Sequence, residues 1–179
     1  MAVDGDEPLQ NYAEMMKFIN IIHDPDGLDI GARRITVSTS GVVPKIDALA
    51  EEPLQLNLAI SLHAPDDELR SRLVPINRRY PIATVMAAVD RYVEKTGRRV
   101  SFEYALMRGL NDGEQTARDL ATLLNGRLCH VNIIPLNPVE LLPYERPDQA
   151  GIERFADILR TAGIPTSVRY SRGLDIEAA

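Results

Sequence analysis

Helix-like and strand-like segments alternate along almost the whole chain, and this alternation constrains the fold more than any other feature. Apolar residues recur at the i, i+3, i+4, i+7 spacing of an amphipathic helix within residues 12–19, 82–89, 117–124 and 152–159. Short β-like runs lie at residues 34–39, 54–61, 100–106, 129–134 and 166–170. This order predicts an α/β fold of βαβ units, with a parallel sheet and right-handed crossovers that place the helices outside.

The β-like runs have one apolar and one polar face. In residues 100–106, Val100 and Phe102 alternate with Ser101 and Glu103, and residues 54–61 show a similar pattern. Strands that are buried on both faces of a parallel sheet usually read as continuous apolar runs. We therefore expect a curved sheet with helices on one face and a polar lumen on the other. This is a partial barrel, which we favour over a flat doubly wound sheet.

Length and composition are those of an ordinary globular domain. The chain has 179 residues, 45% of them hydrophobic and 26% charged, and no apolar run approaches the ~20 residues of a membrane span. We therefore expect a single domain over residues 1–179, a cytoplasmic location and no membrane partner. The net charge of −6 argues against a surface that coats nucleic acid generally, while Arg98-Arg99 and two similar pairs stay candidates for local RNA contacts.

Cys129 is the only cysteine of the chain. A single thiol excludes an intrachain disulfide and any metal site built from several cysteines of this sequence. Its position at the start of a β-like run favours a buried, unreactive side chain over a nucleophile. No other residues stand at metal-ligand spacing, so we predict no metal ligands in this chain.

Polar residues gather where the β-like runs end. Ser38 lies at the end of one run, and Ser61, Leu62 and His63 lie at the end of the next, before a short expected helix. Because the carboxyl ends of parallel strands meet at one end of a barrel, these residues are expected to share a small-molecule site. His63 could contact a ligand or act as a general base there, although a lone histidine more often binds a loop carbonyl.

Four further candidates are Glu7, Glu103, Asn132 and Asn137. Glu103 is on the polar face of its run, so its carboxylate would point into the lumen, as a site group with a perturbed pKa or as half of an internal ion pair. Asn132 and Asn137 flank a strand end, where an amide can bind a ribose or purine edge or cap a turn. Glu7 precedes the first helix, and taken alone it is better explained as a charged residue near a helix start.

These residues belong to blocks that together resemble the RlmN-type radical SAM methyltransferases, which methylate an adenine of large-subunit ribosomal RNA. The resemblance covers nearly the whole chain, from Glu7 to Ala179, and its most informative block is NLAISLHAPDDELRSRLVPINRRYP at residues 57–81. The other matching blocks are residues 7–11, 34–44, 111–113, 132–138 and 172–179.

The resemblance implies a partial (βα)6 radical-SAM-type barrel, similar to a TIM barrel, here truncated to about its last four βα units plus a C-terminal strand. It also implies S-adenosyl-L-methionine (SAM) and a [4Fe–4S] cluster as cofactors, and 23S rRNA together with tRNA as partners of full-length members. Glu7 would bind the amino group of the methionine part of SAM. The residues that would contact SAM are Glu7, Ser38, Ser61, Leu62, His63 and Asn137.

In the mechanism that the resemblance implies, one SAM molecule methylates a cysteine near the C-terminus. A second SAM is cleaved at the cluster to a 5′-deoxyadenosyl radical, which takes a hydrogen from that methyl group. The resulting methylene radical adds to C2 of the adenine, and a second cysteine helps to resolve the adduct. The cofactors carry the radical chemistry, and the protein supplies position and excludes water.

The chain departs from the family pattern in three places. The family's C-x-x-x-C-x-x-C cluster loop would precede Glu7 and is absent from the sequence, and the methyl-carrying cysteine would follow Ala179. Asp6 stands where the family has glycine, and a side chain there is expected to hinder the approach of the backbone to SAM. We therefore expect a C-terminal fragment that has no catalytic residues of its own and is inactive alone.

Two alternatives stay open. The chain could be a truncated paralogue that acts as a SAM-, nucleotide- or RNA-binding module. It could also be a cluster-free barrel lyase or isomerase that uses Glu103 and His63, which the lack of a second nearby carboxylate disfavours. In either case a truncated barrel leaves sheet edges open, and exposed edges recruit other strands. We therefore expect a homodimer or strand exchange through those edges.

Overall fold

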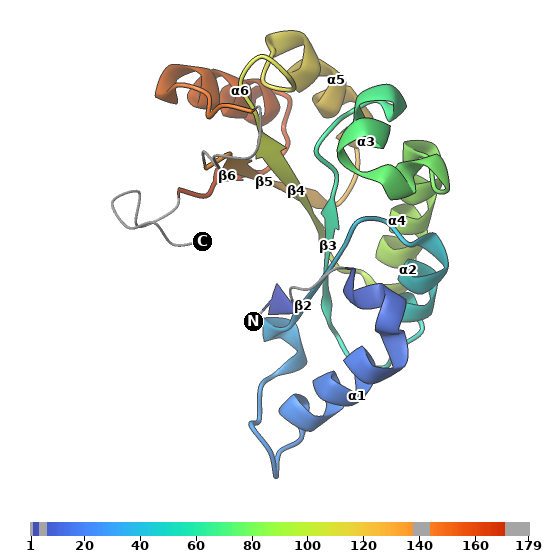
Figure 1. The fold of residues 1–179 in the computed structure, drawn as a ribbon. Helices are drawn as coiled ribbons and strands as arrows, with labels where there is room; N and C mark the ends of the chain where they lie inside the picture. Colours follow the sequence, from blue (N-terminus) through green and yellow to red (C-terminus); the bar gives the residue numbers. More distant parts are fainter. Residues whose placement is uncertain (1, 4–6, 138–143, 171–179) are drawn as a thin grey trace.

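The computed structural model describes residues 2–3, 7–137 and 144–170 (Figure 1). Within them, six parallel strands form one sheet in the order β1-β2-β3-β4-β5-β6. The strands are β1 (Ala2–Val3), β2 (Thr36–Thr39), β3 (Asn57–Ser61), β4 (Val100–Leu106), β5 (Cys129–Pro135) and β6 (Thr166–Val168). Every strand lies beside its predecessor, so right-handed crossovers put all the connections on one face of the sheet.

The helices lie along the outer side of the curved sheet (Figure 1). They are α1 (Tyr12–His23), α2 (Val43–Ala50), α3 (Asp67–Leu73), α4 (Ile82–Thr96), α5 (Glu114–Leu124) and α6 (Gln149–Thr161), with short 3-10 helices η1 (Pro8–Asn11), η2 (Ala32–Arg34) and η3 (Pro75–Arg78). A doubly wound sheet reverses its strand order and has helices on both faces. The predicted fold class, a partial barrel, is therefore confirmed.

Two elements of the structure were not predicted from the sequence. β1 has only two residues, too few to show an alternating pattern, and it adds a fifth βα unit to the four that were expected. α2 occupies a segment that resembles a loop after Gly41. It forms because Pro44 sits in the first helical turn, where no backbone N–H donor is needed. Three strands are also shorter than expected, since β2 begins at Thr36, after η2, β3 begins at Asn57, and β6 ends at Val168.

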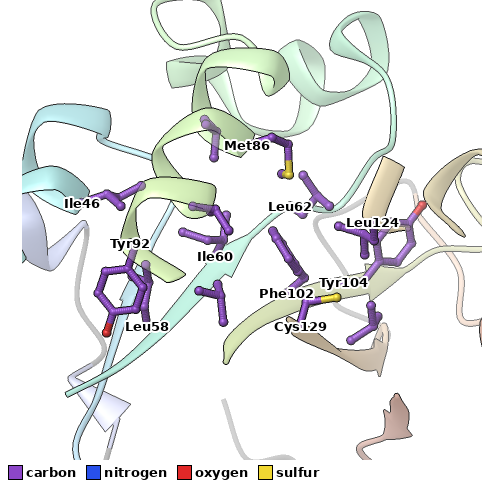
Figure 2. Packing of buried hydrophobic residues seen from close by; sticks show 14 of the residues in the cluster. Ile46, Leu58, Ile60, Leu62, Met86, Tyr92, Phe102, Tyr104, Leu124 and Cys129 are labelled. Atoms are coloured by element: carbon purple, nitrogen blue, oxygen red, sulfur yellow. The ribbon is translucent and has the colours of Figure 1, made fainter. Parts of the chain in front are cut away.

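The hydrophobic core lies between the outer face of the sheet and the helices (Figure 2). β4 alternates strictly, with Phe102 and Tyr104 buried against the helices while Ser101 and Glu103 are partly exposed on the concave face. Cys129 at the start of β5 is only 3% exposed and belongs to the same core cluster, as predicted. Apart from Thr39, which is buried, the polar residues of the strands are therefore left for the concave face.

The register of the sheet arranges these polar residues in rows across the concave face. Near the amino ends of the strands, Thr36 of β2 lies opposite Asn57 of β3. Toward the carboxyl ends, Glu103 of β4 lies between Ser61 of β3 and Asn132 of β5. The concave face thus has a separate polar region at each end.

Candidate functional site

Glu7 lies just after β1, and its carboxylate is held by the carboxyl end of the neighbouring strand β2. Its Oε1 accepts a hydrogen bond from Thr39 Oγ1 at 2.7 Å. Its Oε2 accepts hydrogen bonds from the backbone N–H of Ser40 at 2.7 Å and from the Ser40 hydroxyl. The backbone of Glu7 is left-handed, with φ of 65°, a conformation that costs a non-glycine residue roughly 1–2 kcal/mol. The three donors hold the carboxylate in one orientation. We call Glu7, Thr39 and Ser40 the Glu7 cradle.

The Glu7 cradle keeps an uncompensated negative charge. No ion pair joins the Glu7 carboxylate to a cationic side chain in the part of the chain that the structure describes. An ionised carboxylate has about four acceptor positions, and the cradle uses three of them. At least one position therefore remains for a donor from a ligand, and the charge favours a cationic donor such as an ammonium group.

Arg70 of α3 is fully buried and ties the ends of two strands together. Its Nη2 donates hydrogen bonds to the carbonyl oxygens of Ser40 at 2.6 Å and Ser61 at 3.0 Å. Its Nε donates to the carbonyl oxygen of Leu62 at 3.1 Å, and its Nη1 to Asn77 Oδ1 at 2.7 Å. Burial lowers the pKa of Arg70 to about 10, so the guanidinium is charged at neutral pH. Arg70 thus fixes Ser40 of the cradle relative to the Ser61-Leu62-His63 segment.

His63 is held in place from β4 and the loop after it. Its Nδ1 accepts a hydrogen bond from the backbone N–H of Ala105 at 3.0 Å, and its carbonyl accepts one from Asn111 Nδ2 at 2.9 Å. Burial, assisted by the charge of Arg70, lowers the pKa of His63 to about 4. The ring is therefore neutral at pH 7 with its proton on Nε2, which can donate to a ligand. A group with so low a pKa is a weak general base at neutral pH.

Glu103 and Asn132 lie side by side on the concave face. Glu103 Oε2 accepts a hydrogen bond from Asn132 Nδ2 at 2.8 Å, and Asn132 Oδ1 accepts one from the Ser167 hydroxyl at 3.2 Å. Burial raises the pKa of Glu103, opposed by the bond from Asn132 and the charge of Arg169. The predicted lumenal position of Glu103 is confirmed. Among the described residues it is bonded to an amide and not paired with a cation within 4.0 Å, and no hydrogen bond joins it to His63.

Three other residues that were predicted to contact SAM differ from one another in exposure and in hydrogen bonding. Ser38 is partly exposed on the concave face of β2. Leu62 is fully buried with its side chain in the core (Figure 2), and its backbone N–H already donates to the carbonyl of Glu103 at 3.0 Å, while its carbonyl accepts from Arg70 Nε. Asn137 follows β5 and is exposed, and its Oδ1 accepts a hydrogen bond from Arg146 Nη1 at 3.3 Å. The structure therefore places the predicted residues along the sheet toward its carboxyl end, and their contacts with SAM stay predictions.

The buried polar residues that hold the strand ends of this site in position were not predicted from the sequence. The buried polar side chains of the described residues are Thr39, Arg70, Asn77 and Asn111. Each of them hydrogen-bonds to the Glu7 cradle or to the ends of β2, β3 and β4, directly or through another of the four. An arginine in a short charged helix looks solvent-exposed in a sequence, because periodicity does not show that its guanidinium turns inward. The only signal was that all four residues fall in blocks of the family resemblance.

Two predictions concern residues outside the described ranges. Asp6, whose side chain is expected to hinder SAM, precedes the first residue of the cradle, and Ala179 ends the chain. The structure tests neither expectation, and both stay predictions.

Comparison with known proteins gives the family of the chain. A model of the radical SAM superfamily matches residues 3–121, and the chain belongs to this superfamily. It is 54% identical over 174 residues to the probable dual-specificity RNA methyltransferase RlmN of Symbiobacterium thermophilum, a match that covers 97% of this chain and 47% of that protein. The protein of the same description from Bacillus licheniformis is 51% identical over 173 residues, with 97% and 48% covered. The chain thus spans about half the length of these relatives.

Solved structures agree with this result. The crystal structure of a radical SAM methyltransferase from Sphaerobacter thermophilus has a TM-score of 0.95 and 59% sequence identity, covering 99% of this chain and 52% of that one. A domain of the pyruvate-formate lyase-activating enzyme from Bacteroides vulgatus has a TM-score of 0.71 at 15% identity, which supports the fold alone. The resemblance to RlmN-type enzymes and the radical-SAM-type fold are both confirmed.

The superfamily implies SAM and a [4Fe–4S] cluster, and the chain fits only the first. The Glu7 cradle offers an oriented, uncompensated carboxylate, which suits the ammonium group of SAM. Thiolates hold such clusters, but Cys129 is the only thiol, and burial raises its pKa. No group of three or more His, Cys, Asp or Glu side chains is placed to hold a metal within the described ranges. The helices described there include none that could cross a membrane.

Proposed function

We propose that this chain binds SAM at the carboxyl ends of its strands and forms the cofactor-binding part of an RlmN-type RNA methyltransferase acting on 23S rRNA and tRNA. The observation that carries the proposal is the Glu7 cradle, which presents a negative, oriented carboxylate at the position where the family binds the amino group of methionine. The names of the relatives, RNA methyltransferases about half of whose length this chain spans, support the reaction class.

The other residues have roles that follow from their surroundings. Ser38 offers a hydroxyl from the concave face of β2, and Ser61 offers one from the end of β3, while the Leu62 backbone, already bonded to Arg70 and Glu103, fixes that strand end. His63 offers a neutral Nε2–H donor, and Asn137 an amide beyond β5. When bound, SAM supplies the group that is transferred, and these residues bind and orient it. We propose no redox step for this chain, because it has no cysteines placed to ligate a cluster.

Calorimetric titration of SAM into the whole chain tests the proposal, with the variant Glu7→Gln and the control Glu14→Gln. Glu7→Gln keeps the size of the side chain and removes its charge, so we expect SAM to bind at least about tenfold more weakly, since a hydrogen bond to a charged group contributes about 1.5–3 kcal/mol. Glu14 is exposed on α1 and pairs only with Lys17 among the described residues, so its substitution should leave binding unchanged.

The same titration separates the proposal from the nucleotide-binding alternative. Absence of saturable SAM binding, or equal affinity in Glu7→Gln and the unmodified chain, would contradict the proposal. If adenosine bound as tightly as SAM and Glu7→Gln had no effect, the chain would be a nucleotide-binding module instead.

We also propose that two copies of the chain pair through the open edges of the sheet. The edge strands are β1, with two residues, and β6, with three, so the pairing surface within the described residues is short. Light scattering at micromolar concentrations measures the mass of the particle in solution. A mass equal to one chain at all concentrations would contradict the proposed pairing.

A further inference from the structure

A polar pocket lies at the amino ends of the strands, away from the Glu7 cradle. Its volume is about 430 Å³, within the range of about 300–1,000 Å³ found for small-molecule sites. Along β3, Asn57 in the pocket is separated from Ser61 at the other end by about 13 Å, given a rise of about 3.3 Å per residue. The residues that line the pocket are Thr36, Asn57, Gly97, Arg98, Arg99 and Ser101.

The pocket is positively charged on a chain whose net charge is −6. Neither Arg98 nor Arg99 forms an ion pair with a carboxylate in the described ranges, and Arg99 has no hydrogen bond from its side chain there. The carboxyl end of α4 also lies at the pocket, because its C-cap residue, Gly97, is part of the lining. The carboxyl end of a helix carries only about half a negative charge. Two full guanidinium charges exceed that, so the pocket favours an anion.

A buried donor without a partner lies in the pocket. Among the described residues, the buried side-chain nitrogens that lack a hydrogen-bond partner are Arg98 Nε and His130 Nδ1, and of these two only Arg98 belongs to the lining of the pocket. The Ser167 hydroxyl donates to Asn132, so His130 Nε2 donates to Ser167, and His130 Nδ1 is an acceptor in the neutral ring that does not attract an anion. Buried polar groups are nearly always satisfied, so the unpartnered Nε–H of Arg98 calls for an explanation.

The donors of the pocket are also held in position. Asn57 Nδ2 donates to the carbonyl of Arg33 at 2.7 Å, which leaves Asn57 Oδ1 to accept from Arg98 Nη2 at 2.5 Å. This bond uses one of the five N–H groups of the Arg98 guanidinium and fixes the direction of the rest. The hydroxyls of Thr36 and Ser101 lie on the same concave face. Guanidinium and hydroxyl donors that converge without a carboxylate suit a group with several acceptor oxygens and a negative charge.

From this arrangement we propose that the pocket at the amino ends of β2, β3 and β4 is an anion site that binds a phosphate group, with Arg98 and Arg99 as its main ligands. The phosphate can belong to a small phosphorylated molecule, such as a nucleotide, or to the backbone of an RNA. The site is distinct from the Glu7 cradle, and the proposal does not depend on SAM binding.

Calorimetric titration of inorganic phosphate into the whole chain at low ionic strength tests the proposal. Arg99→Gln removes an exposed guanidinium that has no hydrogen bond in the described ranges, so the variant should fold normally and bind phosphate at least about tenfold more weakly. Arg99→Lys should lose less, because it keeps the charge and loses only the planar fork. Arg118→Gln on α5, which breaks one exposed ion pair with Glu114, is the matched control and should bind as the unmodified chain does.

A second variant and two further ligands complete the test. Arg98→Gln should weaken phosphate binding as well, and circular dichroism shows whether it folds. Adenosine 5′-monophosphate that binds more tightly than a single-stranded RNA hexamer identifies a small phosphorylated ligand, and the reverse order identifies RNA. The proposal is overturned if phosphate does not bind saturably, or if Arg99→Gln binds it as well as Arg118→Gln does. Glu7→Gln should not affect phosphate binding, so failure of one site is distinguishable from failure of the other.

Discussion

His63 combines a left-handed backbone, with φ of 61°, and a ring whose pKa is far below its usual value. Among the described residues outside glycine, the positive φ angles belong to Glu7, Asp29 and His63, so two of the three lie in the candidate site. Strained backbone of this kind persists only where surrounding contacts hold it. For His63 those contacts are the bonds to Ala105 and Asn111, which fix both the ring and the carbonyl.

The low pKa of His63 predicts a loss of stability in mild acid. The folded ring has a pKa of about 4, below the ~6.5 of an unfolded histidine, so the unfolded state binds more protons between these values. The contribution of His63 is complete above pH ~6.5 and falls as the pH drops toward 4. Between pH 7 and pH 5 we expect His63 to reduce the free energy of unfolding by about 2 kcal/mol, measured by urea denaturation.

His63→Asn is the control for this prediction. Its amide oxygen replaces the ring Nδ1 and can accept the bond from Ala105, and it does not titrate, so the stability of the variant should fall less over the same interval. The effect of all other groups cancels in the comparison. Equal pH dependence of the two proteins would show that His63 titrates normally in the folded chain.

At the scale of elements, the turn from β2 into α2 depends on Gly41. Its φ is 108°, and a Cβ there would lie 3.0 Å from Val85 Cγ2 of α4 and 3.5 Å from Arg70 Nη2. Gly41→Ala should therefore reduce the free energy of unfolding by at least about 2 kcal/mol, through strain and a close contact. Because Gly41 follows Ser40, the variant should also weaken SAM binding. Urea denaturation and calorimetry measure the two effects.

Gly97 provides the comparison for Gly41. It also has a positive φ, of 64°, but a Cβ added there would have no atom within 4 Å. Gly97→Ala should cost only about 1 kcal/mol, from the left-handed backbone alone, and should leave SAM binding unchanged. If the two variants lost equal stability, the contact with Val85 would have no effect and the turn would be more adaptable than its geometry indicates.

Sequence patterns predicted the elements that repeat a signal over several residues. The alternation in β4 and the apolar stripes of α4, α5 and α6 each extend far enough to be recognised, and the curved sheet follows from them. β1 and α2 were missed because one is two residues long and the other begins among residues that favour a turn. The inward turn of Arg70 could not be predicted, because it depends on three carbonyls from two different strand ends.

For the whole molecule, the curvature of the sheet separates its polar sites from its only thiol. The polar residues face the concave side, where the Glu7 cradle and the phosphate-binding pocket lie at opposite ends. Cys129 lies on the other side, 3% exposed in the core beneath the helices (Figure 2), and burial raises its pKa. A thiol in that position cannot reach a ligand on the concave face unless the sheet and helices separate.

Cys129 should therefore be unreactive until the chain unfolds. If exposure needs global unfolding at a cost of about 5 kcal/mol or more, a thiol reagent such as Ellman's should react more than about a thousandfold more slowly with the native chain than with the denatured one. The denatured chain should release one equivalent of the coloured thiolate of the reagent, from its single cysteine. Rapid reaction of the native chain would mean that the core around Cys129 opens far more readily than its packing implies.

Addition of iron and sulfide to the native chain should leave no bound cluster after desalting, because Cys₄ ligation needs thiolates that this chain does not supply. Retained iron and sulfide with visible charge-transfer absorbance would mean that side chains other than cysteine ligate a cluster.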